Sequence, residues 1–330
     1  MKSRNIFILA TILISLGVFA YYYKTKMSNK PNTYNVGLIY LLQHPAIDQG
    51  VEGFKSELSK IETETGVKIN VTYSNAFGEP KNVNGIISTF VQNKSDVIVA
   101  LTTPCAQISK QLVKEKPIIF VGVSDPVGAG LIKGLENGSE NVTGTTSKDP
   151  NFETLELATK IFPKMKKVGV IYTATEANSV SILKSLEEKI KSNNLNIEIL
   201  KKSISTTTEI LPTAKSLLAD VDAMFLINDN TVISSVELLI KLSNEGKKPL
   251  FASDIESVNK GALFTYGLNY RDEGIASAQI LKQILIDKKN PSQIPIYVNS
   301  KYYLFVNKKL MSYNIDTALI KGAEIVGKWI

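Results

Sequence analysis

The chain has 330 residues, 44% of them hydrophobic and 21% charged, so it is long enough to form two lobes that each bury a core. Its single cysteine, Cys105, excludes an intrachain disulfide and a metal cluster built on cysteines. The net charge is +7, but the basic residues are dispersed, and short basic runs such as 164–167 are typical of a solvated surface. We therefore expect no nucleic-acid partner.

The N-terminus, 1–33, predicts an export segment followed by a polar linker. Lys2 and Arg4 precede an apolar run from Ile6 to Ala20, as in a signal peptide that is cleaved after Ala20. Alternatively, the tyrosines at 21–23 extend the run to the lower limit of a membrane span, and the uncleaved segment would anchor the chain to the cytoplasmic membrane. Both alternatives predict that the rest of the chain is periplasmic or otherwise extracytoplasmic.

The next part of the chain alternates between predicted strands and helices, which indicates a parallel sheet. Two of the strands are short, continuous apolar runs, typical of strands that are buried on both faces. The predicted strands are Tyr34–Leu42, Val67–Tyr73, Val97–Leu101 and Ile118–Val123, and the predicted helices are one from Ala46, Val83–Gln92 and Ala106–Lys114. The segment 131–146 is rich in Gly, Asn, Ser and Thr, so we expect a connection and a lobe boundary there.

The pattern then restarts, since Val168–Tyr172 repeats the order of apolar residues and glycine in Val36–Tyr40. This repeat predicts an α/β fold with two Rossmann-like lobes, parallel sheets and a hinge, with Val36–Leu42 and Val168–Tyr172 in different lobes. We expect the N-terminal lobe to span 34–146 and to be completed by 266–290. We expect the C-terminal lobe to span 147–265 and to be completed by 291–330, with crossings near Thr146 and Gly261.

The second half continues the same alternation. Strands are predicted at Ile197–Leu200, Ala223–Ile227, Pro249–Ala252, Leu263–Tyr266, Ile294–Val298 and Tyr302–Val306, and helices at Val180–Ile190, Ile210–Leu218, Val232–Ser243, Gly274–Ile286 and Asp316–Lys321.

Polar residues follow several predicted strands, at the edge where open α/β sheets bind ligands. Hydroxyls at a strand-to-helix junction suit a carboxylate, and aspartates suit an ammonium group. Each of these residues also has an ordinary alternative role as a helix cap or a turn residue. The candidate ligand-binding residues are His44, Thr102, Thr103, Ser124, Asp125, Glu176, Asn178, Asp229, Asn230 and Asp254.

The sequence gives little support for catalysis or for a cofactor. His44 is the only histidine, so a histidine metal cluster is excluded, and neither a nucleophile elbow nor a glycine-rich nucleotide-binding motif is present. We expect no enzyme, no metal and no cofactor. A hydrolase that uses the crevice stays as a minor alternative, and a membrane-anchored ligand-sensing receptor domain is a second.

Several segments, in order, are similar to one family. The chain resembles the ABC-transporter substrate-binding proteins of the tryptophan/tyrosine-permease type, which have the type I periplasmic binding protein fold, over about 34–310. The segments that carry the resemblance are QHPAIDQGVEGF, SNAFGEP, VALTTPCAQ, VGVSDPVGAGL, ENVTG, TEANSV, NDNTV and SDIESVNKGA. Two features depart from the family: the chain has no lipobox cysteine, and Phe77 stands where a polar residue is common.

The resemblance implies a binding protein that captures a small ligand between two lobes by hinge closure. It implies an amino acid as the ligand, an aromatic one in particular, and an ABC permease with its ATPase as partners. In this reading the ligand carboxylate meets Thr102 and Thr103, and the ammonium group meets Asp254.

Overall fold

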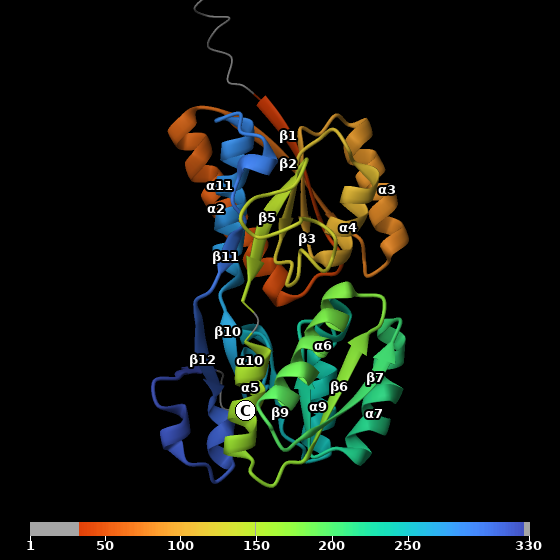
Figure 1. Cartoon of the computed structure of the whole chain (residues 1–330), viewed down its shortest axis with the longest axis vertical. Helices are drawn as coiled ribbons and strands as arrows, with labels where there is room; N and C mark the ends of the chain where they lie inside the picture. Colours follow the sequence, from red (N-terminus) through yellow and green to blue (C-terminus); the bar gives the residue numbers. More distant parts are fainter. Residues whose placement is uncertain (1–32, 149, 327–330) are drawn as a thin grey trace, which may run out of the picture.

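The computed structural model describes residues 33–148 and 150–326, and Figure 1 shows them as two lobes joined along one side. The predicted export segment lies outside the described residues. Among the residues that are described, no helix is both long enough and apolar enough to cross a membrane.

The N-terminal lobe, at the top of Figure 1, is built on a six-stranded parallel sheet in the order β11-β5-β4-β3-β1-β2. Its elements are β1 (Thr33–Tyr40), α2 (Pro45–Thr65), β2 (Lys68–Asn75), α3 (Pro80–Gln92), β3 (Val97–Leu101), α4 (Thr103–Leu112), β4 (Ile118–Val121), β5 (Val142–Ser147), α11 (Tyr270–Leu285), η2 (Pro291–Gln293) and β11 (Tyr297–Asn299).

Alternate residues of the buried strands face opposite helical layers, because side chains alternate along a strand. Val97 and Val99 belong to the cluster that packs against α2 and α11, whereas Ile98 and Ala100 pack with residues of α3 and α4. The central strands are therefore apolar on both faces, and only their ends are free to carry polar groups.

The C-terminal lobe, at the bottom of Figure 1, contains a four-stranded parallel sheet in the order β7-β6-β8-β9. Its elements are α5 (Asn151–Ile161), β6 (Lys167–Thr173), α6 (Ala177–Ser192), β7 (Glu198–Ile204), η1 (Thr207–Glu209), α7 (Ile210–Asp220), β8 (Ala223–Leu226), α8 (Asn230–Ile233), α9 (Val236–Glu245), β9 (Leu250–Ala252), α10 (Ile255–Asn259), β10 (Phe264–Leu268), β12 (Tyr302–Asn307), η3 (Lys308–Ser312), η4 (Thr317–Ile320) and β13 (Glu324–Val326).

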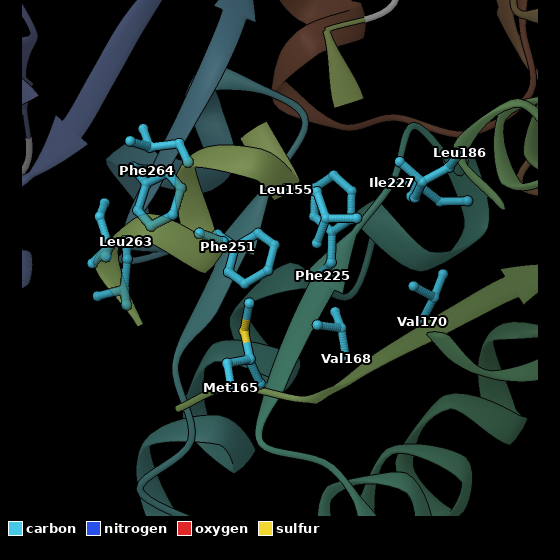
Figure 2. Packing of buried hydrophobic residues seen from close by; sticks show 14 of the residues in the cluster. Leu155, Met165, Val168, Val170, Leu186, Phe225, Ile227, Phe251, Leu263 and Phe264 are labelled. Carbon is cyan, nitrogen blue, oxygen red and sulfur yellow. The ribbon is translucent and has the colours of Figure 1, made fainter. Parts of the chain in front are cut away.

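Three phenylalanines form the centre of one core of this lobe (Figure 2). The rings of Phe225 and Phe251 stack at 5.0 Å between centroids, and those of Phe251 and Phe264 stack at 5.4 Å. Phe264 lies on β10, which pairs with β12 in a separate sheet of the order β10-β12-β13. The last strands of the chain thus share a core with the four-stranded sheet.

The placement of β1 and β6 in different sheets confirms the two-lobed α/β fold that the sequence repeat predicts. The chain passes between the lobes after β5, after β10 and after β11. The second crossing lies near Asn269 and not at Gly261, because β10 still pairs with β12 in the C-terminal lobe. The sequence assigns 291–330 to that lobe, but β11 pairs with β5 in the N-terminal sheet.

Two local predictions also differ from the structure. The segment 131–146, which we expected to be a connection, contains most of β5. This strand is rich in threonine, although five of its residues are buried. The helix predicted at 232–243 is two helices, α8 and α9, with an interruption at Ser234 and Ser235.

Candidate ligand-binding site

One pocket lies between the lobes, at the carboxyl ends of β3 and β4 in one sheet and β8 and β9 in the other. The space between its lining atoms is about 600 Å³, part of it open to solvent. A pocket of this size suits one small molecule. It is lined by His44, Ala46, Ile47, Gly50, Leu101, Thr102, Thr103, Val121, Gly122, Ser124, Asn178, Asn228, Asn230, Ile233, Asp254, Tyr270 and Glu273.

Thr102 and Thr103 occupy the junction between β3 and α4 at the pocket wall. Thr102 has φ 78° and ψ 152°, a left-handed conformation that strains a β-branched residue. Its hydroxyl oxygen is buried and has no hydrogen-bond partner. Because α4 begins at Thr103, the positive end of the helix lies at the same wall and favours an anionic group.

His44 contacts the opposite lobe and presents an acceptor to the pocket. Asn230 donates from Nδ2 to Glu176 Oε2 at 2.6 Å, so Asn230 Oδ1 is the atom that lies 3.4 Å from His44 Nε2. Since Oδ1 only accepts, Nε2 carries the proton. Burial lowers the pKa of His44 to about 4, which keeps the ring neutral and leaves the buried, unpartnered Nδ1 as an acceptor.

Asn178 presents a second acceptor from the C-terminal lobe. Its Nδ2 donates to the backbone oxygen of Asn228 at 2.9 Å and to Glu176 Oε2 at 3.2 Å. Both partners are acceptors, which fixes the orientation of the amide. Asn178 Oδ1 is consequently buried at the pocket wall without a partner.

Glu176 and Asp229 lie behind this wall and do not line the pocket. Glu176 accepts hydrogen bonds from the backbone and side-chain groups of Asn230 and Thr231. Asp229 accepts from Thr173, Ser179 and the N–H of Val232. Burial, with the charge of Glu176 as a second cause, raises the pKa of Asp229 to about 6. The pair positions Asn178 and Asn230.

Asp254 lines the pocket, but its carboxylate is occupied. It caps α10, with Oδ1 accepting from the N–H of Ser257 at 2.8 Å and Oδ2 from the Ser257 hydroxyl at 2.5 Å. This is the ordinary capping role that the sequence left open for it. Burial raises the pKa of Asp254.

Ser124 lines the pocket, whereas Asp125, the next residue, does not. Asp125 Oδ1 accepts from the N–H of Gly128, and Oδ2 accepts from the Ser181 hydroxyl of the other lobe. Phe77, where the chain departs from the family, lies outside the pocket with 73% of its surface exposed. It lines a surface groove between β2 and α3.

Sequence reasoning missed two polar residues of the pocket, namely Tyr270 and Glu273, and it placed Asn228 in the strand end 228–230 without including it among the candidate residues. Asn228 directly precedes the predicted pair at 229–230, so the strand-end pattern already contained a signal for it. Tyr270 and Glu273 lie in the first turn of α11, where an acidic residue is expected on an exposed face. Glu273 is fully buried instead, and burial raises its pKa to about 7 although Thr145, which donates a hydrogen bond to it, the N–H of Gly122 and the Ser147 side chain all lower the pKa.

The charged residues that line the pocket are all acidic. No lysine or arginine lines it, whereas Asp254 and Glu273 do. Within 33–148 and 150–326, no group of three or more His, Cys, Asp or Glu residues is arranged to hold a metal ion. The wall can thus offer hydrogen-bond acceptors to a ligand, together with hydroxyls and one helix N-terminus.

Comparison with known proteins gives consistent results. The model of the ABC transporter substrate binding protein family matches residues 35–317. A tyrosine-binding protein of Clostridioides difficile is 34% identical over 285 residues, which cover 86% of this chain and 82% of that relative. An uncharacterized protein of Rickettsia prowazekii is 24% identical over 276 residues, which cover 83% of this chain and 83% of that relative.

Solved structures agree with this assignment. The ABC domain from Streptococcus pneumonia in complex with L-Trp has a TM-score of 0.84 and 26% identity, covering 89% of this chain and 100% of that one. The ligand-free, open structure of a substrate binding protein with adhesive properties from Clostridium difficile has a TM-score of 0.64 and 30% identity, covering 90% of this chain and 100% of that one. By the family match, the relatives and the two-lobed fold, this chain belongs to the ABC transporter substrate-binding protein family, with the type I periplasmic binding protein fold.

Proposed function

We propose that this protein is the extracytoplasmic solute-binding component of an ABC importer and captures an aromatic amino acid between its lobes. One observation carries the proposal. Four buried polar atoms without a hydrogen-bond partner line the interlobe pocket, and they come from both lobes: His44 Nδ1, Thr102 Oγ1, Asn178 Oδ1 and Glu273 Oε1. Buried polar groups are nearly always paired in native proteins, so such a cluster favours a ligand that supplies the missing partners.

The chemistry of these atoms fits an amino acid. The acceptors His44 Nδ1 and Asn178 Oδ1 suit the N–H groups of an ammonium. The hydroxyls of Thr102 and Thr103, beside the N-terminus of α4, suit a carboxylate, as the sequence predicted. The apolar part of the wall, which includes Ile47, Leu101 and Ile233, suits the side chain of such a ligand.

The relatives support an aromatic side chain. One of them is named a tyrosine-binding protein, and one similar structure contains L-Trp. Both the phenol and the indole are mostly apolar rings, which agrees with the apolar residues of the pocket wall. We therefore propose tyrosine or tryptophan as the ligand.

Hinge closure is the second part of the proposal. Among the described residues, four hydrogen-bonded pairs join the lobes around the pocket: Asp125 with Ser181, His44 with Asn230, Gln49 with Glu256, and Asn228 with Tyr270. The TM-score is 0.84 to the structure with L-Trp and 0.64 to the ligand-free, open structure, although the second is more similar in sequence. Both observations support a closed conformation here, from which a ligand would leave after the lobes rotate apart.

Membership of the family supports the two remaining parts of the proposal, the transporter partners and the extracytoplasmic location. Delivery to a permease with its ATPase requires that the binding lobes lie outside the cytoplasm, as the export segment predicts. Membrane attachment through an uncleaved segment is compatible with the same role.

A ligand screen tests the function directly. Residues 33–330 are purified and heated with each of the twenty amino acids, because a ligand that binds the folded state raises its unfolding temperature. We expect L-tyrosine or L-tryptophan to give the largest increase and their D-enantiomers to give little, with calorimetry measuring the dissociation constant. Stabilisation by none of the amino acids, or by non-aromatic ones alone, would contradict the proposed ligand class.

A further inference from the structure

We propose that Glu273 is the residue that recognises the ligand's ammonium group, an inference that rests on the proposed amino-acid-binding function. Glu273 is fully buried and lines the interlobe pocket. Its Oε2 accepts from the Thr145 hydroxyl at 2.9 Å, while its Oε1 has no hydrogen-bond partner. A buried carboxylate with a free oxygen is costly unless a cation or a donor is brought to it.

The other buried acids near the pocket are already satisfied. Both oxygens of Asp254 accept from Ser257. Glu176 and Asp229 accept from several donors of the C-terminal lobe and do not line the pocket. Among these four carboxylates, Glu273 alone combines a position at the pocket wall with an oxygen that has no partner.

No protein cation compensates Glu273 from within the pocket, because the wall contains no lysine or arginine. The neighbouring polar atoms do not fill this role either. Asn178 Oδ1 and His44 Nδ1 are acceptors in the network described above. A ligand ammonium supplies both the positive charge and the N–H donors, whereas a ligand that is only an anion would be repelled.

The backbone holds Glu273 firmly in place. Gly274, the next residue, packs so closely on α2 that an added Cβ would lie 2.0 Å from the Gly50 oxygen. On the sheet side, Thr145 accepts from the N–H of Gly122 and donates to Glu273, which connects β4, β5 and α11. The carboxylate is thus pre-positioned on a rigid helix, and binding requires little further ordering.

The test compares Glu273→Gln with wild type, using ligands that differ only in the amine. The ligands are L-tyrosine and L-tryptophan, the analogues without the amine (3-(4-hydroxyphenyl)propionate and indole-3-propionate), and the amines tyramine and tryptamine. We expect Glu273→Gln to weaken amino-acid binding by at least about 30-fold, the scale for truncating a buried charge pair. Any binding of the analogues without the amine should be unchanged or stronger, because repulsion of their carboxylate is relieved.

Two further variants separate ammonium recognition from a structural role. Glu57→Gln is the matched control. Glu57 is a buried glutamate on α2 that lies outside the pocket and accepts a hydrogen bond from the Gln279 side chain of α11. The unliganded Glu273→Gln protein should be at least as stable as wild type at pH 8, because a neutral amide needs no counter-charge. If Glu273→Gln is less stable than wild type and loses affinity equally for all the ligands, Glu273 has a structural role and the inference is overturned.

Asp254→Asn tests the alternative that Asp254 binds the ammonium group, as the sequence predicted. A loss of amino-acid binding in Asp254→Asn, with Glu273→Gln unaffected, would assign the ammonium to Asp254 and overturn the inference.

If wild type binds the amines but no amino acid, the proposed function fails while the role of Glu273 is still tested on the amines. If wild type binds no ligand that carries an amine, both fail.

Discussion

Asp125 and Ser181 join the two lobes beside the pocket, with the Ser181 hydroxyl donating to Asp125 Oδ2 at 2.6 Å. Asp125 follows β4 in the N-terminal lobe, and Ser181 lies in the first turns of α6 in the C-terminal lobe. Asp125 Oδ1 also accepts from the N–H of Gly128, which holds the carboxylate in place for the partner lobe. In the proposed hinge motion this bond would form only while the lobes are closed, so it would favour the closed conformation over the open one.

Removing this bond should weaken ligand binding without changing a ligand contact. Ser181→Ala leaves the Asp125 turn intact and should raise the dissociation constant by about 3- to 10-fold, the range for a partly exposed hydrogen bond to a carboxylate. Calorimetry with the best ligand from the screen measures the change. Ser192→Ala, at the exposed end of the same helix, is the control. Equal affinities for Ser181→Ala and wild type would show that the bond adds nothing to closure.

The buried acid Glu176 should matter for stability as well as for binding. In Glu176→Gln one carboxylate oxygen becomes an NH₂ group, which would face the buried donors of Asn230 or of Thr231. We expect the free energy of unfolding to fall by about 2–4 kcal/mol, as buried donors lose their acceptor. Urea unfolding measures the change, and Glu188→Gln, on the exposed face of α6, should stay within about 0.5 kcal/mol of wild type. A loss no larger than that of the control would contradict the assigned role.

Strand burial explains how far the sequence could predict this structure. The strand predicted at Val97–Leu101 matches β3 because all its residues are buried and apolar. β5 escaped prediction because threonines serve there as buried residues. Their hydroxyls find partners that are distant in sequence, such as the Ile294 oxygen for Thr143 and the Glu273 carboxylate for Thr145. No local pattern in a single sequence reveals such partners.

The same distinction applies to the pocket. The rule that ligands bind at strand ends directs attention to Thr102, Asn178 and Asn230, which do lie at the wall. It cannot separate a carboxylate that caps a helix, as Asp254 does, from one with a free oxygen, because both follow a strand or begin a helix. Glu273 lies on a helix that returns from the other lobe, and its burial depends on how α11 packs against α2.

The strained residue Thr102 allows a separate test of the carboxylate site. Thr102→Gly removes the unpartnered hydroxyl and suits the backbone, since φ 78° is natural for glycine. The variant should be as stable as wild type or up to about 1 kcal/mol more stable. It should bind L-tyrosine about 10- to 150-fold more weakly, the scale of one lost hydrogen bond to a charged group, while any affinity for tyramine, which has no carboxylate, is unchanged. An equal loss of affinity for L-tyrosine and tyramine would show that the Thr102 hydroxyl does not bind the ligand carboxylate.

The pH dependence of stability tests the burial of Glu273 without any ligand. Burial raises the pKa of Glu273 to about 7 from its ordinary 4.5. The native state therefore holds this proton more tightly than the unfolded state, and its stabilising effect is full below about pH 4.5 and is lost as the pH rises through about 7. Glutamine does not titrate, so the stability of Glu273→Gln relative to wild type should increase by about 2–3 kcal/mol between pH 5 and 8.

The comparison with the variant is essential, because His44 acts in the opposite direction. Burial lowers the pKa of His44 to about 4, so the unfolded state binds its proton more tightly, and stability rises with pH between about 4 and 6.5. Asp229 and Asp254 have raised pKa values and act in the same direction as Glu273. All three are present in both proteins, so their contributions largely cancel in the difference between the two urea unfolding curves. A difference that stays constant from pH 5 to 8 would mean that Glu273 titrates like an exposed glutamate and is not the buried, uncompensated carboxylate described here.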